Sequence, residues 1–226
     1  MIDDVEQNGN IDNYYESTKH NIKLTRGHSE KFEHISWTEV PSSKTSGTVK
    51  VSYAALSLGD AKVPKYYCNQ YNKYLGMDFS GYDINGARVM GVVQEGAVSS
   101  AVESDPDLLW PVPENWTLGE AATVPLPFLH AYYCLAVKYS LHKGKTVLIT
   151  DGAGGLGQAV ISLCLGLDCN IFTTVIDETV KRGLLQLYPQ LDEKNIGYSE
   201  EDAFFLVRQN TNNQRCHVVI NNSGVR

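Results

Sequence analysis

The sequence predicts an α/β protein in which a β-rich half precedes a parallel sheet covered by helices. Up to about Pro113 the chain carries short alternating segments separated by turn residues, as antiparallel strands do. Beyond Asn115, buried strands alternate with helical patterns, which indicates a parallel sheet with right-handed crossovers. A glycine-rich turn joins the first of these strands to its helix.

Composition and charge narrow the class of protein. The chain has 226 residues, of which 42% are hydrophobic and 20% charged, an ordinary globular composition with room for one large or two modest domains. The net charge of −7 argues against nucleic-acid and anionic-membrane partners. No apolar run is long enough for a membrane span. The 5 cysteines form no C-x-x-C pair, so we expect no metal site, no disulfide framework and a cytoplasmic location.

The first half contains a leader and a β-rich region. Residues 1–21 mix Asp, Glu, Asn and Tyr without periodicity and are interpreted as a disordered leader or linker. Residues 47–53 alternate in the manner of a strand. Residues 83–86 include Asn-Gly, which is typical of the turn of a β-hairpin.

The transition to the second half is a helix start. Thr117, with Glu120 three residues later, predicts a capping box at a helix N-terminus. The mostly apolar segment that follows has Pro125 and Pro127 near its start, which predicts two helical pieces rather than one.

The second half reads as a β-α-β-α-β-α-β series. The first strand is a continuous apolar run, as expected for a strand buried on both faces. The predicted strands cover residues 146–150, 170–175, 195–198 and 217–220, and the predicted helices cover 156–167, 178–187 and 202–208.

The most informative motif is the G-x-G-x-x-G turn after the first of these strands. Gly152 permits a tight turn, Gly154 lets the backbone approach a diphosphate, and Gly157 lets the helix pack on the strand. The helix N-terminus then offers N–H groups and a partial positive charge to phosphates. The alternative is a glycine-rich turn that binds no ligand.

Residues after the second strand should distinguish NAD from NADP. Asp177 stands near where an acidic residue would bind a ribose hydroxyl, although it can equally cap the helix that begins at Glu178. Lys181 and Arg182 follow within one helical turn and suit a 2′-phosphate, although a solvated helix face is the alternative. We therefore predict a preference for NADPH.

The order of these motifs resembles the medium-chain dehydrogenase/reductase superfamily, and most closely the enoyl-reductase domain of animal fatty acid synthase. The resemblance runs from about residue 22 to residue 221. The similar segments include Leu24–Gly27, Ile35–Trp37, Val51–Leu56, Leu75–Gly81, Gly86–Gly91, Trp110–Pro113, Asn115–Leu118, Ala131–Tyr133, Gly154–Gln158, Ile171–Val175, Lys181–Arg182 and Tyr188–Asp192.

The resemblance implies a fold, an activity and a site. The fold would be a GroES-like substrate domain over residues 22–117, followed by a Rossmann NADP-binding domain with a doubly wound parallel sheet over residues 118–226. The activity would be enoyl reductase: hydride passes from NADPH to the β-carbon of a trans-2-enoyl chain on an acyl carrier protein, and a proton is added at the α-carbon. The predicted cofactor-binding residues are Gly152, Ala153, Gly154, Gly155, Leu156, Gly157, Thr174, Lys181, Arg182 and Asn221.

The resemblance also sets the expected partners and the open alternatives. We expect the enoyl chain on its carrier protein, the other domains of a fatty acid synthase, and a homodimer of the full-length protein. The Rossmann sheet is expected to be incomplete at its C-terminal end, with the proton donors beyond Arg226, so no catalytic residue is assigned. The alternatives are a stand-alone quinone or alkenal oxidoreductase and a non-catalytic remnant of the same domain.

Overall fold

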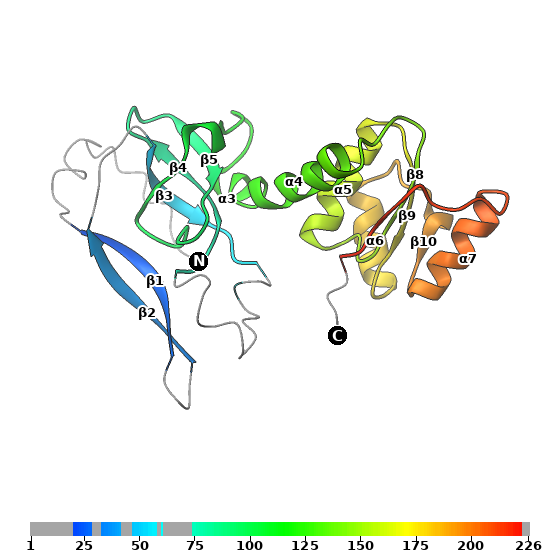
Figure 1. Cartoon of the computed structure of the whole chain (residues 1–226), viewed down its shortest axis with the longest axis horizontal. Coiled ribbons are helices and arrows are strands. Elements are labelled where there is room, and N and C mark those ends of the chain that lie inside the picture. The colour runs from blue at the N-terminus through cyan, green and yellow to red at the C-terminus, as the bar shows by residue number, and fades with distance from the viewer. Residues whose placement is uncertain (1–19, 29–32, 42–46, 58–59, 61–73, 223–226) are drawn as a thin grey trace. The chain divides into compact units, whose positions relative to one another are not determined.

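The computed structural model describes residues 20–28, 33–41, 47–57, 60 and 74–222, and the chain divides into two compact units, Met1–Leu126 and Pro127–Arg226 (Figure 1). The predicted leader, residues 1–21, falls outside the described residues except for His20 and Asn21, which begin the first strand. The division between the units lies downstream of the residue 117/118 boundary predicted from sequence.

The first unit is built from antiparallel strands. A two-stranded hairpin pairs β1 with β2, and a five-stranded sheet has the order β6-β3-β4-β5-β7. Side chains that include Val49, Phe79 and Val102 form the core of this sheet. The strands are β1 (His20–His28), β2 (Glu33–Pro41), β3 (Thr48–Ala54), β4 (Asp78–Asp83), β5 (Arg88–Val92), β6 (Ala101–Glu103) and β7 (Leu109–Pro111), with the 3-10 turn η1 (Pro106–Leu108) before β7.

The predicted hairpin turn is confirmed between β4 and β5. The Asp83 carboxylate accepts hydrogen bonds from the backbone N–H groups of Asn85, at 2.9 Å, and Ala87, at 2.7 Å. Gly86 has a φ of +80°, a conformation that glycine adopts without steric cost. The Asx-type turn therefore sets the register of this hairpin.

The predicted capping box is also confirmed. Thr117 accepts from the Glu120 N–H at 3.2 Å, and the Glu120 carboxylate accepts from the Thr117 N–H at 2.8 Å, at the start of α3 (Leu118–Ala121). A second helix, α4 (Pro125–Tyr132), begins at a proline and continues as the π-helix η2 (Tyr133–Lys138), which confirms two helical pieces.

The second unit is a parallel sheet, as predicted, and its strands have the order β10-β9-β8-β11 (Figure 1). Each crossover between its strands contains a helix, and α6 has the predicted bounds. The elements are β8 (Thr146–Ile149), α5 (Gly155–Gly166), β9 (Asn170–Thr174), α6 (Glu178–Leu187), η3 (Glu193–Asn195), β10 (Ile196–Gly197), α7 (Glu200–Asn210) and β11 (Val218–Ile220).

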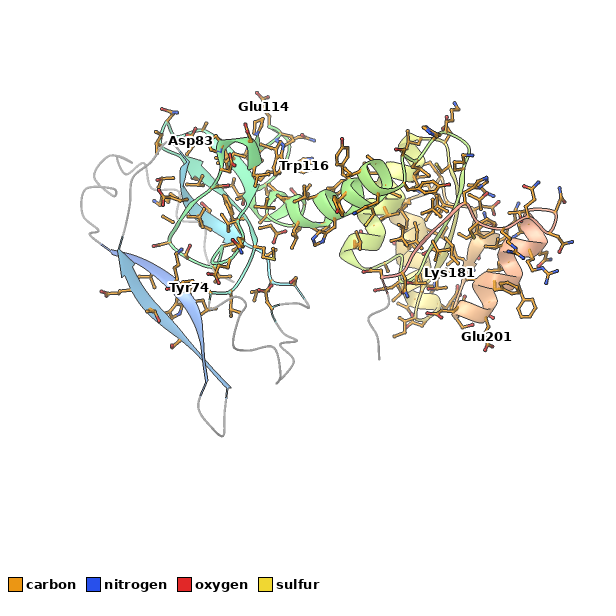
Figure 2. All side chains as sticks on the ribbon, in the orientation of Figure 1. Tyr74, Asp83, Glu114, Trp116, Lys181 and Glu201 are labelled. Carbon is orange, nitrogen blue, oxygen red and sulfur yellow. The ribbon has the colours of Figure 1, made fainter. Side chains whose placement is uncertain are left out.

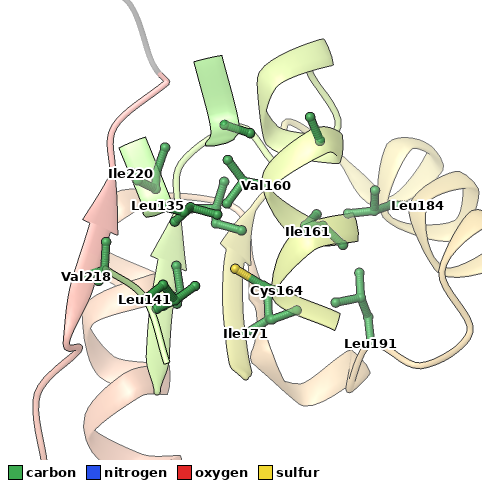
Figure 3. Packing of buried hydrophobic residues seen from close by; sticks show 14 of the residues in the cluster. Leu135, Leu141, Val160, Ile161, Cys164, Ile171, Leu184, Leu191, Val218 and Ile220 are labelled. Carbon is green, nitrogen blue, oxygen red and sulfur yellow. The ribbon is translucent and has the colours of Figure 1, made fainter. Parts of the chain in front are cut away.

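The core of the second unit lies between the sheet and the helices packed on it (Figure 3). Val160, Ile161 and Cys164 of α5 are fully buried, as are Val147 and Ile149 of β8. Since each such side chain contributes about 1.5–3 kcal/mol when removed from water, this packing holds the start of α5 in place relative to β8.

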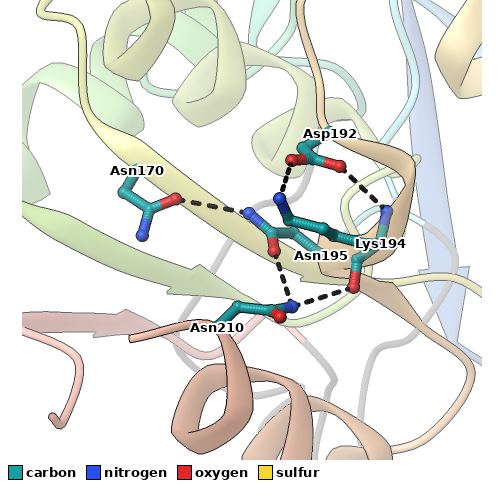
Figure 4. A network of polar contacts seen from close by, with 5 residues as sticks. All are labelled: Asn170, Asp192, Lys194, Asn195 and Asn210. Carbon is teal, nitrogen blue, oxygen red and sulfur yellow. Dashed lines mark hydrogen bonds and ion pairs between the residues drawn. The ribbon is translucent and has the colours of Figure 1, made fainter. Parts of the chain in front are cut away.

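A polar network closes the amino end of the sheet (Figure 4). Asn195 donates to Asn170 at 3.3 Å and accepts from Asn210 at 3.1 Å, which joins the start of β9 to the end of α7. Ligands of such sheets bind at the carboxyl ends of the strands, so this network is structural.

Candidate functional site

The carboxyl ends of the four parallel strands bring the predicted site residues to one edge of the sheet. The glycine turn follows β8, Thr174 ends β9, and Asn221 follows β11. Lys181 and Arg182 lie on α6, the helix after β9. This edge is where dinucleotides bind in doubly wound sheets.

The three motif glycines stand where a side chain could not be placed without movement. A Cβ on Gly152 would lie 2.1 Å from Thr173 Oγ1, and one on Gly157 would lie 2.3 Å from the carbonyl oxygen of Asp151. One on Gly154 would lie 2.7 Å from a carboxylate oxygen of Asp151. Gly157 therefore permits the close approach of α5 to the turn, as the sequence predicts.

Thr174 and Asn221 hold the turn rather than stand free. The Thr174 hydroxyl accepts from the Asp151 N–H at 3.0 Å, and its carbonyl accepts from the Gly152 N–H at 2.9 Å. The Asn221 side-chain oxygen accepts from the Thr150 hydroxyl at 3.0 Å. In this arrangement both residues position the loop.

The start of α5 can receive an anion. Gly154 is its N-cap, and no side chain caps the helix. The N–H groups of Gly155 and Leu156 in the first turn, with the helix dipole, form the kind of site that binds phosphate. Ala153 is held by a 2.7 Å hydrogen bond from the Gln158 amide to its carbonyl. The loop from Gly152 to Gly157, which we call the glycine cradle, lies at a helix start that no side chain caps. This arrangement fits the diphosphate of a dinucleotide.

Asp177 is a helix cap. Its carboxylate accepts from the Val180 N–H at 2.9 Å at the start of α6. Of the two roles that the sequence left open, the structure shows capping.

Lys181 lies on α6 (Figure 2), beside an acidic and an aromatic side chain. Its side chain is only 12% exposed and its ammonium lies 3.4 Å from Glu193 Oε1 and 5.6 Å from the centre of the Tyr198 ring. Arg182 is exposed. Lys181 is therefore partly neutralised before any phosphate arrives.

Sequence reasoning missed Tyr198, which directly follows β10 and lies beside Lys181. The Tyr198 hydroxyl donates to Glu178, and this hydrogen bond raises the pKa of Tyr198. Its position was accessible from sequence, because residues after successive parallel strands share one edge of the sheet.

Replacement of Lys181 and Arg182 by alanine should weaken NADPH binding while leaving NADH binding nearly unchanged. Charge-assisted hydrogen bonds contribute about 1.5–3 kcal/mol each, so the ratio of the two dissociation constants should shift by about tenfold or more. Fluorescence titration with each nucleotide measures the ratio, and Lys143→Ala, at an exposed lysine on the loop before β8, controls for the loss of a surface positive charge away from the site. An unchanged ratio in the double variant contradicts the assignment.

The first unit contains a buried carboxyl group at Asp78, which is 3% exposed. Burial raises the pKa of Asp78 to about 6, while a hydrogen bond from the Leu126 backbone opposes the shift and the nearby Asp60 adds to it. Asp60 itself accepts from Ser57 N–H at 2.8 Å and Gly76 N–H at 2.9 Å. These two carboxyl groups connect the strand β4, the loop before it and the start of α4.

The described residues contain no group of three or more His, Cys, Asp and Glu side chains placed to hold a metal ion. No helix in that part of the chain has the length and apolar character needed to cross a membrane.

Curated proteins with similar sequences include large synthases. The chain is 29% identical over 213 residues to the highly-reducing polyketide synthase 1 of Aureobasidium melanogenum, a match that covers 90% of this chain and 10% of that protein. It is 34% identical over 137 residues to erythronolide synthase EryA2 of Saccharopolyspora erythraea, a match that covers 60% of this chain and 4% of that protein. The human synaptic vesicle membrane protein VAT-1 homolog-like is 31% identical over 143 residues, covering 62% and 33%. No protein-family model matches the chain.

Solved structures show the same fold. The enoyl reductase CurK aligns with a TM-score of 0.68 and 21% identity over 88% of this chain and 66% of its own. An alcohol dehydrogenase superfamily protein from Novosphingobium aromaticivorans aligns with a TM-score of 0.75 and 20% identity over 89% and 65%. The chain thus spans about two thirds of these structures and a third or less of the curated relatives above.

Proposed function

We propose that this chain, an enoyl-reductase-like domain with the medium-chain dehydrogenase/reductase fold, takes part in the NADPH-dependent reduction of trans-2-enoyl thioesters on an acyl carrier protein. The observation that carries the proposal is the glycine cradle at Gly152–Gly157 beneath the uncapped start of α5. The similarity to polyketide synthases and the shared fold with CurK support it.

The residues have separate roles in this proposal. When bound, NADPH supplies the hydride. The loop from Gly152 to Gly157 would bind its diphosphate, with Thr174 and Asn221 positioning the loop. Lys181 and Arg182, with Tyr198 beside Lys181, would bind the 2′-phosphate. Residues 22–117 would contribute the substrate domain and residues 118–226 the nucleotide-binding domain.

The assembly and location are part of the same proposal. The relatives named above include multidomain synthases, so we place the chain within a cytoplasmic, homodimeric synthase whose carrier protein presents the substrate. The fatty acid synthase assignment stays a prediction, because the synthases among these relatives make polyketides.

The test is a nucleotide-binding and turnover experiment on the full-length protein that contains this chain. NADPH fluorescence should show saturable binding, and NADPH oxidation should depend on a crotonyl thioester. Saturable binding without oxidation would contradict the enoyl reductase activity and leave the nucleotide site in place. No binding at all would contradict both.

A non-catalytic domain of the same fold is the second candidate, and one observation favours it. Asp151, immediately before the first glycine, places a carboxylate beside Gly154 at the point where a diphosphate would approach. A full-length protein that folds but binds no NADPH, either as wild type or as Asp151→Asn, would favour this candidate.

A further inference from the structure

Asp151 is an acidic residue held in an unusual backbone conformation inside the phosphate loop. Its φ is +53°, in the left-handed region, and its side chain is exposed. Its N–H donates to Thr174 Oγ1 at 3.0 Å, and its carbonyl accepts from the Gly154 N–H at 3.2 Å. Because the backbone is held on both sides, the turn fixes the position of the Asp151 Cβ.

The carboxylate lies beside the N-cap of α5. Asp151 Oδ2 lies 2.7 Å from the position that a Cβ of Gly154 would occupy, and the Asn222 amide nitrogen lies 3.0 Å from the same position. Among the described residues, no hydrogen bond or ion pair engages the Asp151 carboxylate. Gly154, the residue predicted to let a diphosphate approach, therefore has beside it a carboxylate without a hydrogen-bond or ion-pair partner in the described part of the chain.

The N-terminus of α5 stabilises one anion at this place, and two anions compete for it. The helix dipole and the first-turn N–H groups favour negative charge, whether it belongs to a carboxylate or to a phosphate. Two negative groups a few ångströms apart repel each other.

We propose that Asp151 limits the affinity of the dinucleotide site: its carboxylate competes with the diphosphate for the start of α5 and lowers the affinity for NADPH. This rests on the proposed function, since it concerns the same site. The carboxylate must turn away, or tolerate the phosphate charge, each time the nucleotide binds.

Asp151→Asn tests the competition with little change of shape, because asparagine tolerates the left-handed region. Asp151→Gly, which suits the same φ, is a second variant in case the first folds poorly. Asp168→Asn is the matched control: Asp168 has a φ of +49° just beyond the opposite end of α5 and pairs with Lys143 at 2.7 Å. Each control and variant removes one negative charge.

The affinity for NADPH is measured by fluorescence and calorimetric titration of the full chain. The dissociation constant should be at least tenfold lower for Asp151→Asn and Asp151→Gly than for the wild type. That of Asp168→Asn should equal the wild-type value. Binding by the Asp151 variants alone also supports the proposal. Equal affinity in wild type and Asp151 variants overturns the proposal and leaves the proposed function standing. An equal gain in Asp168→Asn overturns it as well, and no binding by any folded protein overturns both.

Discussion

Gly157→Ala should reduce NADPH affinity by about a hundredfold or more and destabilise the fold. The added Cβ would lie 2.3 Å from the Asp151 carbonyl oxygen and 2.7 Å from the Cα of Gly152, so the helix and the turn must separate. Both neighbours are backbone atoms that have no rotamer with which to relieve the clash. A misplacement of about 1 Å can cost roughly a hundredfold in catalytic rate, and we expect a loss of similar size in the affinity of a site made of backbone N–H groups. Fluorescence titration measures the affinity, and thermal unfolding measures the stability.

Gly166→Ala is the control on the same helix. A Cβ at Gly166, the last residue of α5, meets nothing within 4 Å. Replacement of a helical glycine by alanine should stabilise the protein by roughly 0.5–1 kcal/mol without an effect on NADPH binding. Equal NADPH affinity in the two variants would show that the approach of α5 to the turn is not required for the site.

The second large expected effect is on stability against pH, through Asp78. Burial raises the pKa of Asp78 from 3.8 to about 6, so the folded protein holds this proton more tightly than the unfolded chain does. Ionisation of Asp78 in the folded state lowers the free energy of unfolding. This loss of stability is absent below pH 4, grows as the pH rises from 4 to 6, and is complete above 6. A shift of about two pKa units corresponds to about 3 kcal/mol.

Asp78→Asn should remove this loss of stability because the amide cannot ionise. The amide oxygen can still accept a hydrogen bond from the Leu126 N–H. We expect the variant to be more stable than the wild type at pH 8, by up to about 3 kcal/mol, and close to it at pH 4. Denaturant unfolding at both pH values measures the difference. Asp107→Asn, at an exposed aspartate, controls for net charge. If the free energy of unfolding of Asp78→Asn changed between pH 4 and pH 8 as much as that of the wild type, Asp78 would be ruled out as the source of the change.

Local patterns were sufficient to predict the strands of the parallel sheet and the helices between them, whereas the 3-10 turn η3 was not predicted. Helix α6 begins at Glu178 and ends at Leu187 as predicted, since Asp177 caps it and its apolar side recurs at helical spacing. The Thr117–Glu120 box and the Asp83–Gly86 turn are likewise set by residues three or four apart in the chain. Signals of this kind need no tertiary contact.

Pairings between distant segments were harder to predict. The short strands β6 and β7 were not predicted, because three residues carry too little periodicity and each is stabilised by its pairing with β3 or β5. The hairpin of β1 and β2 was not predicted either, although Ile35–Trp37 falls within it. The irregular register of β3 between Val51 and Tyr53 is a property of its pairing with β4.

The order of residues along this chain was enough to locate a glycine turn between a buried strand and a helix, and to place Lys181 and Arg182 after the next strand. It could not show that Lys181 contacts Glu193 and Tyr198, that Thr174 supports the turn, or that Asp151 covers Gly154. Each of these facts depends on which side chains the parallel strands bring to one edge. A spacing in sequence specifies a local backbone shape, whereas the charge and the space around that backbone come from segments that meet only when the chain has folded.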